Sequence, residues 1–215
     1  ARAALRVEVE AEFAALSGRL DAAARAVTLD PDVMQRAERG DATALRQLFE
    51  QAATSSSTHG VAVTIYGATN QPLAWLGRSE DVPEPRLTGS ASTFLAQSSQ
   101  GLQLVRVQPV DDAATTGRHI GAVVAEVALP RSQAGSLAGS EFSLDTALVP
   151  VALRLQFEGA SEPGPNAFVI RSSTNEPLAA VLVSDADLLG AQRRLRDRLI
   201  AAELALAGVL LLLAI

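Results

Sequence analysis

The chain has 215 residues, which is enough for one large domain or two small ones. Its hydrophobic fraction of 48% and charged fraction of 20% exclude a disordered protein. The net charge of −6 and the absence of lysine argue against nucleic-acid binding, which needs clustered basic side chains. With no cysteine, the chain has no disulfide, thiolate metal ligand or cysteine nucleophile.

The N-terminal part of the chain shows a helical hydrophobic period. Apolar residues at steps of three, four or seven predict one long helix over residues 2–28. The residues of this stripe are Leu5, Val9, Phe13, Leu16, Leu20 and Val27. The stripe suits two roles, because such steps serve equally to cover a sheet and to pair with a second copy of the helix.

Two aspartates mark the starts of further helices. Asp30 stands before a proline and predicts a short second helix, since aspartate is a favoured N-cap and proline suits the first turn. Asp41 predicts a third helix, in which we expect Phe49 among the buried residues. The polar run 54–58 is predicted to break this helix.

After residue 60 the hydrophobic period changes to the alternation that is typical of β-strands. Residues 61–66 and 72–76 are predicted to form a hairpin around a turn at 67–70. Further strands are predicted at 92–98, 102–108 and 120–129, with loops at 79–91 and 111–117.

A Ser- and Gly-rich stretch at 131–146 is the best candidate for a domain boundary. A smaller β unit is predicted beyond it, with a strand at 149–157 and a hairpin made by 167–170 and 178–183. Ser184 and the aspartate three residues later resemble a capping box, so we expect a last helix from 185 to the end.

The C-terminal segment is predicted to be a membrane anchor. Glu203 is the only charge in Leu199–Ile215, and the part after it is apolar on all helix faces, which favours a membrane helix over the alternative of a buried core helix. Because this run is shorter than the roughly 20 residues of a full span, we expect the chain to be part of a longer protein. The arginines at 193–198 alone would place the preceding residues inside the cell. We expect residues 1–198 to lie outside, since this rule weakens beside a large domain.

Two segments carry a resemblance to a known family: VAVTIYGATNQPLAWLGRS (61–79) and GRHIGAVVAEVAL (117–129). The chain resembles the Cache family of bacterial extracytoplasmic sensor domains, which have a PAS-like sheet. In that family the first segment is the central hairpin and the second is the closing strand of the membrane-distal module. The family's usual helix between the second and third strands is replaced here by the predicted loop, and the Tyr, Arg and Trp pattern of its amino-acid-binding subset is not traceable.

The resemblance implies an α+β fold. A long N-terminal helix would pack on a PAS/Cache-like antiparallel sheet, followed by a smaller membrane-proximal β unit and a C-terminal helix that enters the membrane. The implied division is an N-terminal helical segment (1–58), a membrane-distal module (59–130), a reduced membrane-proximal module (147–184) and a helix running into a transmembrane segment (185–215).

No catalytic constellation stands out in the sequence. His59 and His119 are the only imidazoles, and neither has a metal-ligand spacing. The glycines form no phosphate-binding loop, and there is no nucleophile elbow. Carboxylate pairs such as Asp111–Asp112 fall in predicted loops. We therefore expect no catalytic residue, metal or cofactor in this chain, although the resemblance allows the full-length protein to be a histidine kinase.

A ligand pocket is the better hypothesis, because pockets are mostly apolar with a few fixed polar groups. Tyr66 and Trp75, the only Tyr and Trp, lie with Arg78 on or just after the predicted hairpin. Arg78 could pair with a carboxylate through two hydrogen bonds. Arg106 and His119 are weaker candidates. In the alternative interpretation Trp75 packs in the core and Arg78 points to solvent.

We therefore expect the sensor portion of a two-component histidine kinase in the bacterial inner membrane. Its partners would be a small-molecule ligand, a second copy bound through the N-terminal helix, and the membrane through 199–215. A chemoreceptor or a cyclic-dinucleotide enzyme are other outputs that the resemblance allows. The alternative function is a membrane-anchored periplasmic scaffold or transport accessory protein. The sensor function predicts a HAMP or kinase segment after Ile215, whereas the scaffold function predicts no signalling domain there.

Overall fold

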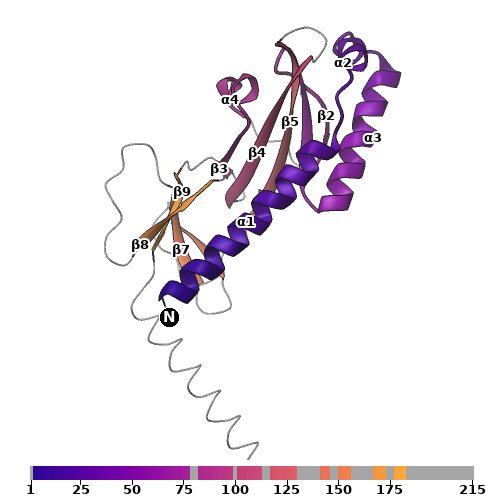
Figure 1. Ribbon diagram of the computed structural model, residues 1–215. Helices are drawn as coiled ribbons and strands as arrows, with labels where there is room; N and C mark the ends of the chain where they lie inside the picture. The colour runs from indigo at the N-terminus through magenta and orange to yellow at the C-terminus, as the bar shows by residue number, and fades with distance from the viewer. Residues whose placement is uncertain are drawn as a thin grey trace, which may run out of the picture.

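The computed structural model describes residues 2–77, 82–98, 101–112, 117–129, 141–145, 150–155, 167–172 and 177–182. In this part of the chain a long helix runs along two antiparallel sheets (Figure 1). The predicted C-terminal helix and membrane segment at 185–215 lie outside the described residues. Among the described helices, none combines the length and the apolar character that crossing a membrane requires.

The elements confirm the α+β class, with a long N-terminal helix and a five-stranded antiparallel sheet. The helices are α1 (Arg2–Ala26), α2 (Pro31–Glu38), α3 (Ala42–His59) and α4 (Glu84–Thr88). The first sheet contains β1 (Ala62–Gly67), β2 (Pro72–Leu76), β3 (Ser92–Ser98), β4 (Gly101–Asp112) and β5 (Arg118–Ala128) in the order β2-β1-β5-β4-β3. The second contains β6 (Glu141–Asp145), β7 (Pro150–Leu155), β8 (Ala167–Arg171) and β9 (Pro177–Leu182) in the order β6-β7-β9-β8.

The predicted N-caps of α2 and α3 are confirmed. Asp30 accepts hydrogen bonds from the backbone N–H groups of Asp32 and Val33, at 2.9 and 3.1 Å. Asp41 accepts one from Ala44 at 2.8 Å. These bonds satisfy amide groups that have no acceptor within their own helix, and so fix where each helix begins.

The predicted break at 54–58 is wrong, because α3 continues through it. Thr54 and Thr58 each donate a hydrogen bond to the carbonyl four residues earlier, both at 2.8 Å, so their hydroxyl groups are satisfied within the helix. Ser55 is buried and donates to the carbonyl of Ala23 at 2.8 Å. The polar run therefore joins α3 to α1 instead of ending it.

Two other expectations for the N-terminal half are also wrong. Phe49 is 47% exposed, because Leu48 takes the inward position on α3 and its neighbour turns to solvent. The predicted loop 79–91 contains α4, whose first turn carries a proline, a residue that suits a helix start.

The strands are longer or more numerous than predicted at two places. β4 extends into the predicted loop 111–117, because Asp111 and Asp112 pair with His119 and Arg118 of β5. The strand β6 lies inside the predicted boundary 131–146. The other strands, including both hairpins, occur where hydrophobic alternation predicts them.

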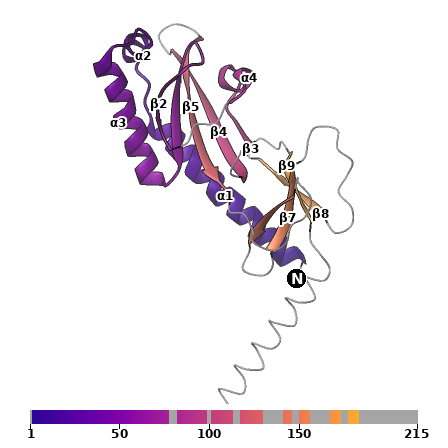
Figure 2. The ribbon, with the colours of Figure 1, turned by 180° about the vertical axis from the view of Figure 1, so that it is seen from behind.

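Both faces of the first sheet are covered. α1 lies against β4 and β5 and α3 against β1 and β2, forming the larger core, in which Val63, Ile65 and Leu104 are fully buried (Figures 1 and 2). α4 contacts β4 and β5 and covers a smaller cluster that contains Tyr66 and Val107 on the opposite face. This double cover explains why the central strands are apolar on both faces.

Gly121 in β5 lies where β1 and α2 come close to its backbone. Its φ is +154°, and a Cβ there would collide with the carbonyl oxygen of Tyr66 in β1 and lie 2.8 Å from Cε of Met34 in α2. Only glycine fits such a position without moving backbone. Gly121 therefore sets how closely α2 and β1 can pack on β5.

We predict that Gly121→Ala lowers the free energy of unfolding by more than about 2 kcal/mol, because backbone atoms must shift to admit the methyl group. Gly18→Ala in α1 is the matched control, since a Cβ there meets nothing within 4 Å. It should raise stability by about 0.5–1 kcal/mol through helix propensity. Urea unfolding followed by circular dichroism measures both. Equal midpoints for Gly121→Ala and the unsubstituted protein would contradict the close approach.

Candidate ligand-binding cleft

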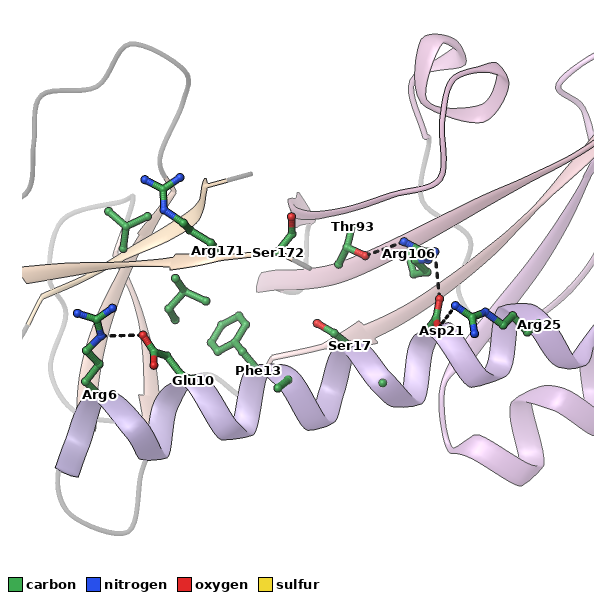
Figure 3. Close-up of a pocket in the computed structure, with 14 residues that line it drawn as sticks. Arg6, Glu10, Phe13, Ser17, Asp21, Arg25, Thr93, Arg106, Arg171 and Ser172 are labelled. Atoms are coloured by element: carbon green, nitrogen blue, oxygen red, sulfur yellow. Dashed lines mark hydrogen bonds and ion pairs between the residues drawn. The ribbon is translucent and has the colours of Figure 1, made fainter. Parts of the chain in front are cut away.

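A cleft of about 640 Å³ lies between α1 and the two sheets (Figure 3). The first sheet contributes Thr93 of β3 and Arg106 of β4, and the second contributes residues 169–172 in and just after β8. The helix contributes side chains from Arg6 to Arg25. The volume lies within the range of small-molecule sites, about 300–1,000 Å³. The long helix α1 and both sheets therefore meet at this cleft.

Small residues on α1 create the space. Ala14, Ser17 and Gly18 line the cleft, and their spacing of three and four places them on one side of the helix together with Asp21. A Cβ added at Gly18 would meet nothing within 4 Å. Ala14 and Gly18 are exposed and Ser17 is partly exposed, so this side of the helix borders the open cleft, whereas Phe13 one turn earlier is buried.

Arg106 is the buried cation of the cleft, with 8% of its surface exposed. Its Nη1 donates to the hydroxyl of Thr93 at 3.4 Å, and its Nη2 donates to Oε1 of Gln108 at 3.2 Å. Its Nε is buried and has no hydrogen-bond partner among the described residues. An unsatisfied buried donor is costly, so this guanidinium keeps capacity to bind another acceptor.

Asp21 joins the helix to the sheet. Its Oδ1 lies 3.0 Å from Nη2 of Arg106 in β4, and its Oδ2 lies 2.7 Å from Nη2 of Arg25 on its own helix. The Arg106 side chain is 10% exposed and that of Arg25 is 71% exposed. Because water screens exposed pairs, the bond to Arg106 contributes more to holding α1 against β4 than the bond to Arg25 does.

The other end of the cleft is also basic. Arg6 pairs with Glu10 at 2.7 Å and lies 5.9 Å from the ring centroid of Phe168 in β8. Figure 3 shows this pair near Arg171, and Asp21 with Arg106 at the opposite end. Four arginines and two acidic residues line the cleft, which leaves a surplus of two positive charges in a chain of net charge −6.

The predicted site residues do not come together. Tyr66 is buried in the cluster under α4, whereas Arg106 points to the opposite face of the sheet, toward α1. Trp75 is 50% exposed on the edge strand β2, so the interpretation that it packs in the core is wrong. Arg78 lies outside the described residues. Among the predicted site residues that the structure describes, only Arg106 lines the cleft.

His119 lies at a third place, near the start of β5. Its Nδ1 is 3.5 Å from Oδ1 of Asp111, and it borders a hollow of about 110 Å³ with Met34 and Glu38 of α2. Among the described residues, no group of three His, Cys, Asp or Glu side chains could hold a metal ion.

Sequence reasoning missed Asp21 and Thr93, and it ranked Arg106 among the weaker candidates. One signal was present in α1. Ala14, Ser17 and Gly18 lie beside the stripe of larger apolar residues, and an aspartate follows on the same side of the helix. Small residues beside the buried stripe of a helix that covers a sheet mark a place where the edge of the packing is not filled.

Comparison with protein-family models and with curated proteins finds no match to this chain. The fold and the cleft are therefore the basis on which a function is proposed.

We predict that a double-mutant cycle of Asp21→Asn and Arg106→Gln gives a coupling free energy of about 1–2 kcal/mol, since the pair is largely shielded from water. The control cycle uses Arg6→Gln and Glu10→Gln, whose side chains are 58% and 44% exposed. It should give no more than about 0.5 kcal/mol. Urea unfolding provides the four stabilities of each cycle. Equal coupling in both cycles would contradict the special role of the Asp21–Arg106 bond.

Proposed function

We propose that this chain is the extracytoplasmic sensory part of a bacterial membrane-bound histidine kinase of the Cache-like class. The observation that carries the proposal is the cleft shared by α1 and both sheets. A small molecule held there touches three parts of the fold, so its affinity depends on how those parts are arranged. Differential affinity for two arrangements is what a sensor needs in order to convert binding into a signal.

The arrangement of the first sheet supports the proposed family. β1 and β5 are hydrogen-bonded neighbours, with a register from Ala62↔Glu126 to Gly67↔Gly121. The two segments that carry the resemblance, 61–79 and 117–129, therefore lie side by side. α4 also supplies a helix between the second and third strands, where the family usually has one. The helix between the second and third strands, where the sequence predicted only a loop, is thus present in the fold.

Helix α1 is the element best placed to pass on a signal. Its C-terminal half borders the first sheet and its N-terminal end approaches the second sheet, where Arg6 lies over Phe168 (Figures 1 and 2). In the proposal the second sheet belongs to the membrane-proximal module, and residues 199–215 continue into the membrane. A shift of α1 against the second sheet is then the output of the sensor.

Dimerisation through α1 is part of the same proposal. The hydrophobic stripe of α1 is used within the chain, because Leu5, Val9 and Leu20 are at most 1% exposed. A contact with a second copy would use the outward side of the helix, where Val7 is 65% exposed.

The location and the output can be tested on the full-length protein in cells and membranes. The chain has no cysteine, so Ala68→Cys, at an exposed turn residue, gives it one labelling site. Labelling of unlysed spheroplasts by a membrane-impermeant maleimide is expected, with the protein lacking this substitution as the control. Labelling only after lysis would place the domain inside the cell and contradict the proposal.

For the output, membrane vesicles that contain the full-length protein should incorporate phosphate from radiolabelled ATP as acid-labile phosphohistidine. Filling the cleft with Gly18→Leu should change this rate, because α1 is the transmitting element. A full-length protein without phosphotransfer would instead favour an anchored scaffold or transport accessory protein.

A further inference from the structure

We propose that the cleft binds a small organic anion with an apolar body, and that the anionic group of this ligand replaces Asp21 on Arg106. The replacement would release α1 from β4. The inference rests on the proposed function in one respect, namely that the released helix is the signal. It places the ligand on the face of the first sheet that α1 covers, away from Tyr66 and Trp75.

The cleft already holds a carboxylate in the position that the ligand would take. The carboxylate of Asp21 lies between two guanidinium groups, at 3.0 Å from Arg106 and 2.7 Å from Arg25. The structure thus contains an internal stand-in for an anionic ligand. Arg106 can also donate a hydrogen bond beyond the one to Asp21, because its buried Nε has no hydrogen-bond partner in the described part of the chain. A ligand carboxylate with two oxygens can engage Nε and Nη2 together.

The exchange is electrostatically feasible because the two partners of Asp21 differ in exposure. The Asp21 side chain is 29% exposed, so it can turn outward and keep its bond to the exposed Arg25. Arg106 is held among buried strand residues and cannot follow. After the exchange each arginine still has a carboxylate, so no buried charge is left unpaired. The step removes the ion pair between α1 and β4.

The remainder of the cleft favours an apolar body of limited length. Ser17 and Phe13 lie one and two turns before Asp21, or about 6 and 12 Å along the helix axis. Phe13 is buried, and Ile170 faces the same space from β8. Ser17 and Gly18 leave room between the anionic end and this apolar end. A single aromatic ring joined to a carboxylate fits that span.

Titration of the 215-residue chain in detergent micelles with phenylacetate tests the chemistry. Isothermal calorimetry measures the affinity, with a titration into protein-free micelles subtracted. Phenylacetamide has the same shape without the charge, and acetate has the charge without the ring. Each should bind at least about tenfold more weakly than phenylacetate, the scale of one charge-assisted hydrogen bond or one buried ring. Equal binding of phenylacetamide, or no binding of phenylacetate, would overturn the proposal.

Variants test the site and the exchange. Arg106→Gln should weaken phenylacetate binding about tenfold or more, and Gly18→Leu should abolish it by filling the cleft. Asp21→Asn should strengthen binding several-fold, because it removes the internal competitor for Arg106. Arg46→Gln changes an exposed arginine of α3 away from the cleft and should have no effect. Circular dichroism checks that each variant is folded, and Gly18→Leu tests the site if Arg106→Gln does not fold.

The direction of the Asp21→Asn effect decides the exchange, since a merely structural aspartate would give unchanged or weaker binding. Either of those results would overturn the exchange. Failure of this inference and failure of the proposed function are distinguishable. Phosphotransfer that phenylacetate leaves unchanged, despite binding in the cleft, would count against the sensor function and not against the site.

Discussion

One face of helix α1 is buried against both sheets, and the rest of the described fold depends on that packing. The apolar residues on this face are almost completely shielded from solvent. They are Leu5, Val9, Phe13, Leu20, Ala23, Ala24 and Val27. Each larger side chain of this kind contributes on the order of 2–5 kcal/mol to the free energy of unfolding, judged by the cost of its truncation to alanine. The helix thereby fixes where each sheet lies.

The same packing explains why the cleft exists and why it is charged. Small residues follow Phe13 on the side of α1 next to its buried face, and the space that they leave is bordered by both sheets. Arg106 reaches this space from β4, an inner strand of the first sheet. Burial of its charge would be costly without a partner, and Asp21 supplies one. The contact that compensates the buried charge is therefore also the contact that ties helix to sheet. A ligand that competes for that charge acts directly on the attachment of α1.

Local signals predicted most of the fold. The caps at Asp30 and Asp41 and the alternation of both hairpins depend on neighbouring residues, which a sequence displays directly. The continuation of α3 through its polar run depends on Ser55 meeting the carbonyl of Ala23, a contact between distant residues. The exposure of Phe49 was missed because Leu48, beside it, satisfies the apolar pattern equally well and only one of the two can face inward.

The candidate site was less predictable, because its parts are far apart in the chain. Asp21, Arg106 and Ile170 come from a helix and from two different sheets. Aromatic residues on the hairpin drew attention to Tyr66 and Trp75, yet one is buried under α4 and the other is largely on the surface. A charged residue inside an apolar strand, such as Arg106 between Val105 and Val107, was the stronger signal, since burial of a charge requires a partner.

The most direct test of the central claim is to find which residues respond to phenylacetate. Nitrogen-15-labelled protein can be titrated and its backbone amide resonances followed by NMR. The account predicts shifts that cluster on α1 from Phe13 to Arg25, on Thr93 and Arg106, and on residues 169–172. Shifts confined to the cluster around Tyr66 under α4, with α1 unaffected, would contradict it.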